Sequence, residues 1–372
     1  MQTAEKHPPI NVNDVFQLTN IGIPSNEVTW SRVSMLSDRW ICVRHSKNND
    51  PKTKASTSTL TVVNLKKDCE YTSYDGGMTD SVLMHPSEPI IALKAFMKFE
   101  VFNLDTKTLI SKTTHHEQVL FWTWLNSDII GIVTDMAVYH WSLWQEDSSP
   151  EKIFNRHSRL EFTEIVSYQA DPTLKWLALT GMSPEEDRIS GITQLYSVDE
   201  EITQCINSHA VCFALYKFCD NLYPSTTFCV GSRDSQDHGK VHVIELRPYH
   251  KGNFAPRSSY DHVQFRDDYD KYDFPISLQV SSKYGLLFMI TKYSYLYICD
   301  METAVCLSCT RIIMDIIFAV TLNTKTQSIL GITRSGQVIS VDLRKDNLLS
   351  NLRDTAKLSS QVTRLEKAIL NS

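Results

Sequence analysis

Seven times along the chain, a run of apolar residues is followed by a short polar turn and a second, more alternating run. In IIGIVTDMAVYHWSL (129–143), Thr134 and Asp135 separate the two runs. The seven units occupy residues 39–66, 89–109, 129–143, 175–199, 226–247, 284–303 and 328–343. This pattern predicts β-hairpins whose first strand is covered on both faces and whose second strand is less buried.

The spacing of the units is close to the period of β-propeller blades. Successive units start roughly 40 to 58 residues apart. Further apolar segments at 119–125, 210–218 and 274–280 can supply the remaining strands of four-stranded blades. We therefore predict an all-β, seven-bladed propeller over residues 1–345. A pair of β-sandwich domains is the alternative, and it does not explain the sevenfold spacing.

The tail, residues 346–372, lacks β-alternation and is predicted to be helical. Leu358, Val362, Leu365 and Ile369 recur at helical spacing. Two heptads are too few for a convincing coiled coil. We expect a short helix packed under the last blade.

Charge and hydropathy exclude several classes of protein. The net charge is only -6, without the clustered Lys and Arg of a nucleic-acid-binding surface. The N-terminus has no apolar signal-peptide core, and no window approaches the roughly 20 apolar residues of a bilayer span. These observations predict a soluble, intracellular chain.

The nine cysteines are an odd number, and most lie inside apolar strands. This placement favours reduced thiols over a disulfide framework. Cys306 and Cys309 have the C-x-x-C spacing of metal and redox sites. In a regular strand these two side chains face opposite sides, and no second C-x-x-C completes a zinc site. We therefore interpret them as strand cysteines and predict no metal or cofactor.

No catalytic motif is present in the sequence. His115 and His116 lie in a polar stretch, which favours a solvated loop over a metal site. DDYDKYDF (267–274) lacks the glycine and glutamate spacing of an EF-hand, and we interpret it as an acidic loop between blades. Propeller enzymes assemble their sites from dispersed residues, so an enzyme stays open as an alternative. The sequence favours a binding module.

Several segments resemble the N-terminal domain of the clathrin heavy-chain family, in the same order and at similar spacing across nearly the whole chain. They are VLFWTWLNSDIIGIVTDMAVYHWSL (119–143), NRHSRLEF (155–162), KWLALTG (175–181), QLYSVD (194–199), HGKVHVIE (238–245), DFPISLQVSSKYGLLFMITKYSYLYICDMET (273–303) and GQVISVDL (336–343). The resemblance implies a propeller that binds short peptide motifs of endocytic adaptors in grooves between blades.

The resemblance also implies what the chain does not carry. In the family, a long α-helical leg follows the propeller and provides trimerisation and light-chain binding. The sequence stops at Ser372, where that leg begins. We therefore expect a monomer that binds no light chain, forms no cage by itself and reaches coated membranes only through adaptors.

The main groove of the family lies between the first and second blades and binds an extended apolar motif that ends in an acid. Ile91, Phe102 and Lys107 match the family pattern. A threonine, a glutamine and a second lysine of the family are replaced by Lys98, Glu100 and Leu109, and SYDGG (73–77) offers no isoleucine. Losing an apolar contact and adding a like charge together cost about 3 kcal/mol, more than a hundredfold in affinity. We expect this groove to be impaired.

Two further grooves follow from the resemblance. The top-face site, which accepts a tryptophan motif in the family, maps to Trp30, Glu164, Val166 and Met182. It stays apolar, but an ionised Glu164 cannot donate hydrogen bonds as the family's glutamine does.

The groove between the fourth and fifth blades maps to Trp176, Glu200 and Gln204. Glu200 replaces an arginine there, which predicts repulsion of acidic motifs. For Ile91, Phe102, Val166 and Trp176, the alternative is ordinary packing between blades.

Two hypotheses about function remain. The first is a propeller that recognises adaptor motifs in vesicle transport and endocytosis. The second is a divergent, legless paralogue that acts as a scaffold or competitor, with degraded adaptor grooves.

Overall fold

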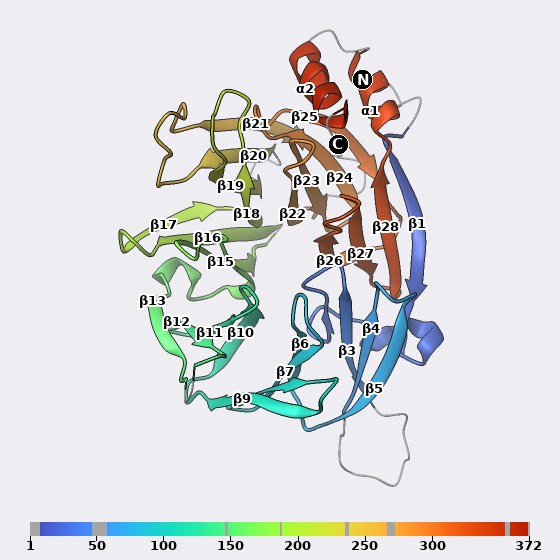
Figure 1. The fold of residues 1–372 in the computed structure, drawn as a ribbon, viewed down its shortest axis with the longest axis vertical. Coiled ribbons are helices and arrows are strands. Elements are labelled where there is room, and N and C mark those ends of the chain that lie inside the picture. The colour runs from blue at the N-terminus through green and yellow to red at the C-terminus, as the bar shows by residue number, and fades with distance from the viewer. Residues whose placement is uncertain are drawn as a thin grey trace.

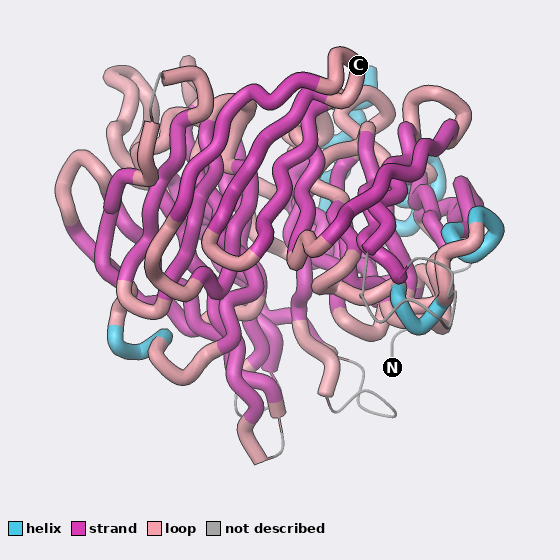
Figure 2. Tube along the Cα trace, turned by 90° about the horizontal axis from the view of Figure 1, so that it is seen from below, coloured by secondary structure: helices cyan, strands magenta, loops and turns pink. Residues whose placement is uncertain are grey.

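The fold is a ring of seven antiparallel sheets, shown in Figure 1. The computed structural model describes residues 8–46, 58–145, 148–186, 188–234, 238–265, 272–353 and 358–370. Within these residues each sheet has four strands, which confirms the predicted seven-bladed propeller. Figure 2 shows the strands crossing the thickness of the molecule, with loops at its two faces.

We number the sheets as blades 1 to 7. Blades 1 to 3 contain β2 (Val33–Ser34), β3 (Trp40–Ser46), β4 (Ser58–Asn64) and β5 (Glu70–Gly77); β6 (Ser81–Met84), β7 (Ile90–Ala95), β8 (Lys98–Asn103) and β9 (Thr108–Thr114); and β10 (Val119–Trp124), β11 (Ile129–Thr134), β12 (Ala137–Ser142) and β13 (Glu151–Asn155).

Blades 4 to 6 contain β14 (Glu164–Ala170), β15 (Trp176–Pro184), β16 (Ile189–Ser197) and β17 (Ile202–Asn207); β18 (Ala210–Tyr216), β19 (Ser225–Arg233), β20 (His238–Glu245) and β21 (Ser258–Gln264); and β22 (Pro275–Ser281), β23 (Leu286–Thr291), β24 (Tyr295–Asp300) and β25 (Cys306–Arg311). The segments predicted to complete the blades at 119–125, 210–218 and 274–280 form the inner strands β10, β18 and β22.

Blade 7 takes strands from both ends of the chain. Its strands are β26 (Ile317–Leu322), β27 (Ile329–Thr333), β28 (Gln337–Leu343) and the N-terminal β1 (Ile10–Gln17). β1 pairs antiparallel with β28, so that Ile10 lies opposite Leu343 and Gln17 opposite Gln337. This pairing closes the ring, as Figure 1 shows where blue β1 lies beside red β28. The hairpin pattern did not predict it.

The core consists of apolar layers between neighbouring blades. Between blades 2 and 3, for example, Phe99 meets Trp122 and Trp141 edge to face, with ring centroids 5.3 and 6.4 Å apart. Phe99 and Trp141 are fully buried. Burying such a side chain contributes about 1.5–3 kcal/mol from apolar transfer. Each blade therefore depends on both neighbours, and the ring is stable as a unit.

The tail forms two α-helices among the described residues, α1 (Lys345–Arg353) and α2 (Ser359–Leu370). Val362 and Leu365 are buried in a cluster with residues of blades 6 and 7, and Leu358 and Ile369 pack against it. The predicted apolar stripe is therefore the packed face of α2. The remaining helical segments are the 3-10 turns η1 (Leu18–Ile21), η2 (Ser25–Glu27) and η3 (Ser158–Leu160). No helix in the described part of the chain is long and apolar enough to span a membrane.

Cys306 and Cys309 face the same side of β25, which contradicts our argument that they face opposite sides. In the register with β24, Cys306 lies opposite Cys299 and Cys309 lies opposite Tyr297. A β-bulge adds one extra residue between Cys306 and Cys309, and this turns both side chains to the same side. Both cysteines pack against one apolar cluster of blades 5 and 6. All nine cysteines of the chain are free thiols. A hydrogen bond with the Cys306 thiol, followed by burial, raises the pKa of Cys299.

His115 is buried, so its placement in a solvated loop was wrong. Its ring meets that of Tyr139 edge-on at 4.5 Å, and burial lowers its pKa. The neighbouring His116 is exposed. Of the acidic stretch 267–274, residues 267–271 lie outside the described residues.

Candidate functional site

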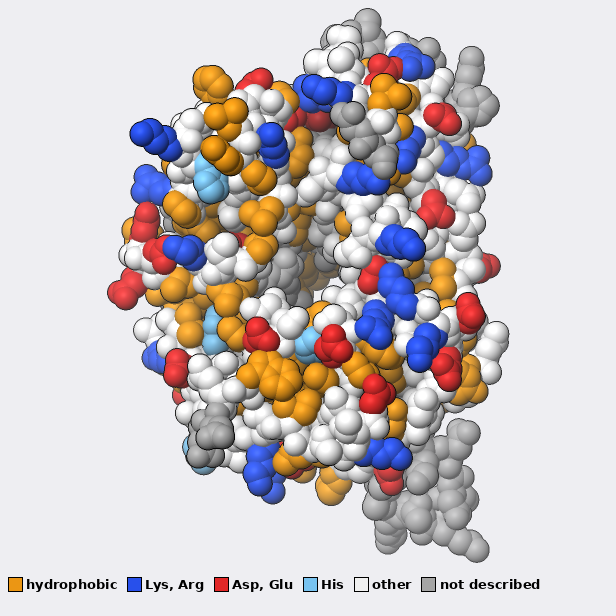
Figure 3. Space-filling model, viewed as in Figure 1, with side chains coloured by type: hydrophobic (Ala, Val, Ile, Leu, Met, Phe, Trp, Pro, Cys, Tyr) orange, Lys and Arg blue, Asp and Glu red, His pale blue; other side chains and the backbone are white. Residues whose placement is uncertain are grey.

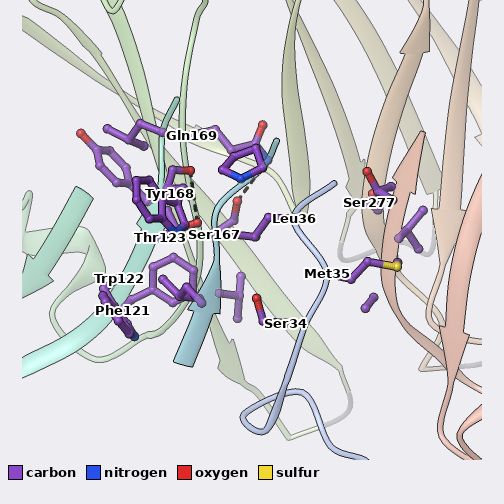
Figure 4. A pocket seen from close by; sticks show the side chains of 18 of the residues that line it. Ser34, Met35, Leu36, Phe121, Trp122, Thr123, Ser167, Tyr168, Gln169 and Ser277 are labelled. Atoms are coloured by element: carbon purple, nitrogen blue, oxygen red, sulfur yellow. Dashed lines mark hydrogen bonds between the residues drawn. The ribbon is translucent and has the colours of Figure 1, made fainter. Parts of the chain in front are cut away.

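A cavity of about 1160 Å³ runs through the centre of the ring, where Figure 3 shows a hollow. It is lined by the inner strands of the blades because those strands face the propeller axis. Figure 4 shows Phe121 and Tyr168 on one side of this cavity and Ser277 on the other. Ser167 accepts a hydrogen bond from the Gln169 side chain at 3.1 Å, so the wall is partly polar.

Four inner strands carry a β-bulge near their first residues, and each bulge places an apolar residue at the cavity. In β10, Val119 pairs with Thr134 and Phe121 with Val133, which leaves Leu120 as the extra residue. Blades 4, 6 and 7 repeat this arrangement in β14, β22 and β26. The four bulged residues, all lining the cavity, are Leu120, Val166, Ile276 and Phe318. They give the start of the channel an apolar wall.

Trp30 lies at the same end of the cavity. Its ring stacks on that of Phe121 in blade 3, with centroids 6.2 Å apart and planes at 18°. Trp30 is 44% exposed, so part of its surface is open to a ligand. The carbonyl of Thr29 holds the segment by accepting from the N–H groups of Arg32 and Val33, each at 3.0 Å.

Glu27 fixes the base of the Trp30 segment. Its carboxylate accepts from the Ser46 N–H at 2.7 Å and pairs with Arg32. Burial acts to raise the pKa of Glu27, but the Ser46 hydrogen bonds and the Arg32 charge lower it overall. The ionised carboxylate is therefore favoured in the fold.

Cations also line the cavity near Trp30. Arg32, Arg44 and Lys94 lie there, with Asp80 as the lining carboxylate among them. The Arg44 Nε is buried and has no hydrogen-bond acceptor. Burial, and then the nearby Arg32 charge, lower the pKa of Arg44. Sequence reasoning missed these cations because they come from blades 1 and 2 and meet only around the axis.

The structure divides the four top-face residues into two pairs. Trp30 and Val166 line the central cavity. Glu164 and Met182 are register partners at the beginning of β14 and the end of β15, next to the Val166 bulge. Glu164 is exposed and Met182 is half-buried. The site therefore combines an aromatic platform, an apolar wall and a carboxylate at its rim.

In the groove between blades 1 and 2, the predicted residues lie along β7 and β8. Ile91 is only 3% exposed and packs with Trp40 and Val62 of blade 1. Phe102 is half-buried against the same cluster, opposite Ile91 in register. Ile91 therefore belongs to the packing between blades, as the alternative interpretation stated.

The polar residues of this groove are more accessible. Lys98 and Glu100 precede Phe102 at alternate positions of β8, so all three share one face of the strand. Lys98 is exposed, as is Lys107 at the turn after β8, where it has a φ of 57°. Lys98 and the end of β8 lie about 17 Å apart, the span of about five extended residues.

Tyr74, the tyrosine of the SYDGG segment (73–77), packs beside this groove from blade 1, a role that the sequence analysis did not assign to it. It lies on β5 and packs against the same cluster as Phe102. Burial, with a contribution from Asp105, raises the pKa of Tyr74. A tyrosine therefore occupies part of the wall for which SYDGG offered no isoleucine.

In the groove between blades 4 and 5, Arg247 bridges two of the three predicted residues, Trp176 and Glu200. The Trp176 indole donates to the Arg247 carbonyl at 2.6 Å, and the Arg247 guanidinium pairs with Glu200 at 3.2 Å. Gln204 is exposed on β17. The cation lost at position 200 is thus partly replaced by Arg247 from the next blade. The predicted repulsion of acidic motifs considered Glu200 alone and did not take its ion pair with Arg247 into account.

The site has the features of a surface that binds ligands. Among the described residues, no group of three or more His, Cys, Asp or Glu side chains is placed to hold a metal ion. What the grooves offer is aromatic and apolar surface with cations beside it.

The chain is 36% identical to a clathrin heavy chain of Drosophila melanogaster over 341 residues, and 34% identical to the human clathrin heavy chain 2 over 342 residues. It is also 34% identical to a clathrin heavy chain of Dictyostelium discoideum over 348 residues. The alignments cover 92–93% of this chain but only 20% of each relative. No family model matches the chain.

The alignments cover more than nine-tenths of a chain whose described residues form a seven-bladed propeller. The chain is a homologue of the clathrin heavy chains, and the homology covers their N-terminal domain.

Proposed function

We propose that this propeller binds short peptide motifs of adaptor proteins in vesicle-mediated transport. It acts by recognition and not by catalysis, as a monomer on the cytoplasmic side of coated membranes, which it reaches through adaptors. The homology to clathrin heavy chains supports the transport role. The stack of Trp30 on Phe121 beside the apolar channel wall is the observation that carries peptide recognition.

The top-face site suits a ligand with an aromatic side chain and an acid. An indole can pack on the exposed part of Trp30 and reach Val166 on the channel wall. The half-buried Arg44 side chain lines the cavity, so its positive charge can attract an acidic group of the ligand. Cationic groups in a cleft also attract acidic peptides over distance.

We expect the groove between blades 1 and 2 to contribute less. Ile91 is already covered, and Glu100 lies in line with Phe102 on β8. A carboxylate there repels the terminal acid of an apolar-acidic motif. We therefore rank the top-face site first and this groove second.

Titration of the purified protein with two fluorescein-labelled peptides, followed by anisotropy, tests the proposal. One peptide carries a tryptophan motif with an acidic neighbour, and the other carries an apolar-acidic motif. We expect the tryptophan peptide to bind with a Kd in the micromolar range and to lose at least tenfold in affinity with Trp30→Ala. We expect the apolar-acidic peptide to bind more weakly and to depend on Phe102.

Trp144→Ala is the matched control, because Trp144 is also an exposed tryptophan but belongs to the turn after β12, away from the cavity lining. It should leave both affinities unchanged. If neither peptide binds at several hundred micromolar, adaptor recognition is wrong. The second hypothesis, a scaffold or competitor with degraded grooves, would then take its place.

A further inference from the structure

Blade 5 carries an exposed apolar surface on two of its loops, which connect β18 to β19 and β20 to β21. Four large side chains form it: Leu222 is 64% exposed, Tyr223 53%, Tyr249 37% and Phe254 70%. We call these four residues the blade-5 platform. Figure 3 shows hydrophobic side chains gathered over this blade, at the upper left of the view.

Two asparagines tie together the loop segments that carry Leu222, Tyr223 and Phe254. The Asn253 carboxamide oxygen accepts from the N–H groups of Leu222 and Tyr223 at 3.0 and 3.1 Å. The Asn253 side-chain amide donates to the Tyr223 carbonyl at 2.9 Å, and Phe254 N–H donates to the Asn221 oxygen at 2.9 Å. The two loops are therefore joined into one unit before any ligand arrives.

Buried polar groups anchor the same loops from below. Glu245 is 2% exposed and accepts from Ser225 Oγ at 2.6 Å and from Arg257 N–H at 3.0 Å. The polar side chains thus point inward while the apolar ones remain outside. Single exposed apolar residues need no explanation, but four of them on two loops that are joined by hydrogen bonds indicate a binding surface.

The charge of these loops differs in sign from that of the whole chain. The net charge of the protein is -6. Residues 217–224 and 246–257 contain one acid and four Lys or Arg residues, namely Asp220 against Lys217, Arg247, Lys251 and Arg257. Two of these cations are already paired with acids, because Arg257 lies 3.0 Å from Asp220 and 3.5 Å from Glu302, and Arg247 lies 3.2 Å from Glu200. Lys217 and Lys251 are exposed, so the rim of the platform favours an acidic ligand.

The size of the platform limits its occupant. Four side chains at these exposures present on the order of 400 Å² of surface, about half of what a standard protein–protein interface buries on each partner. A second copy of the chain or a globular domain would need more contact. A short segment with one or two anchoring side chains fits.

We propose that the blade-5 platform binds a short acidic peptide segment that carries an aromatic or large aliphatic anchor. The anchor packs among Leu222, Tyr223 and Phe254, while acids of the segment face Lys251 and Lys217. This site goes beyond the proposed function. The platform follows the carboxyl end of the inner strand β18, whereas the top-face residues lie near the amino ends of β10 and β14.

Selection from a displayed library of random ten-residue peptides tests this inference. The library is selected on the wild-type protein and counter-selected on a double variant, Leu222→Ser with Phe254→Ser. We expect the surviving peptides to be net negative and to share an aromatic or aliphatic anchor. Their affinities should fall at least tenfold with Phe254→Ser alone and with Lys251→Glu, and should weaken with added salt.

Phe162→Ser is the matched control, since Phe162 is 88% exposed in the turn before β14 and is not part of the platform. It should change no affinity. Melting curves establish that each variant is folded, and Lys251→Glu keeps the test valid if a serine variant is not. The inference is overturned if no peptide distinguishes wild type from the double variant, or if the distinguishing peptides carry no acids.

Sedimentation of the wild-type protein tests the rival occupant. A dimer that Phe254→Ser dissociates would identify a second copy of the chain as the occupant and overturn the peptide. Because Trp30 takes no part in the platform, loss of the tryptophan-peptide binding described above would leave this result intact. The two proposals can therefore fail separately.

Discussion

The indole of Trp30, from the segment before blade 1, stacks on the ring of Phe121 in blade 3, with centroids 6.2 Å apart. The contact joins residues that are 91 positions apart and links blade 3 to the segment that leads into blade 1. It places a partly exposed aromatic side chain beside Val166 and the apolar channel wall. Peptide recognition at the top face depends on this arrangement.

Glu164→Gln should strengthen binding of the tryptophan peptide. Glu164 is exposed at the rim of the top-face site, and its ionised carboxylate can only accept hydrogen bonds. A glutamine can donate to the peptide and does not repel its acids, so we expect a gain of about three- to tenfold in affinity. Anisotropy titration measures it, and an unchanged or weaker affinity would contradict a role for Glu164 in binding.

Ile10→Ala should destabilise the whole propeller. Ile10 is 6% exposed and is the first residue of β1, the strand that closes the ring, where it packs in the apolar cluster of blades 6 and 7. Removing its buried methylene groups should cost about 2–4 kcal/mol in the free energy of unfolding. Val15→Ala is the control on the same strand, because Val15 is 37% exposed and should cost no more than about 0.5 kcal/mol. Urea unfolding compares the two, and equal effects would show that β1 does not hold the ring closed.

Gly191→Ala should be strongly destabilising, whereas Gly331→Ala should be tolerated. A Cβ at position 191 would lie 2.3 Å from the carbonyl oxygen of Ser208, which belongs to the backbone and cannot turn aside. A Cβ at position 331 meets nothing closer than 3.4 Å. We expect the first variant to lose more than 2 kcal/mol or fail to fold, and the second to stay within about 1 kcal/mol of wild type. Similar melting temperatures for the two variants would contradict the close contact.

His140 should make the protein less stable as the pH falls below about 6.5. Burial lowers the pKa of His140 from 6.5 to about 4, and its Nε2 lies 2.7 Å from the Tyr168 hydroxyl. Between pH 6.5 and pH 4 the unfolded chain binds a proton at His140 that the folded protein does not. The contribution of neutral His140 to the free energy of unfolding is therefore fully present above pH 6.5 and is lost as the pH falls to 4. The full effect is on the order of 3 kcal/mol.

The measurement is urea unfolding at a series of pH values, for wild type and His140→Gln. Glutamine can keep a hydrogen bond to Tyr168 but does not titrate. The difference in unfolding free energy between the two proteins should therefore change between pH 6.5 and 4. A constant difference across this window would show that His140 is not responsible.

The blades could be predicted from the sequence because their cause is local. Alternation of apolar and polar residues over a few positions determines which residues form a hairpin and which of its faces is buried. The hairpin at 129–143 became β11 and β12, and the apolar stripe of the tail became the packed face of α2. The assignment of each groove to a pair of blades came from the resemblance, which assumes the same order of blades along the chain.

The tertiary structure alone decided the features that depend on distant residues or on one inserted residue. Ring closure pairs Ile10 with Leu343, and the pairing of Glu200 with Arg247 changes the charge expected in its groove. A single bulge turns Cys306 and Cys309 to the same side of β25. Local alternation carries no information about contacts between blades or about where a strand gains a residue, so the sequence determined the blades, and their packing around the axis decided the sites.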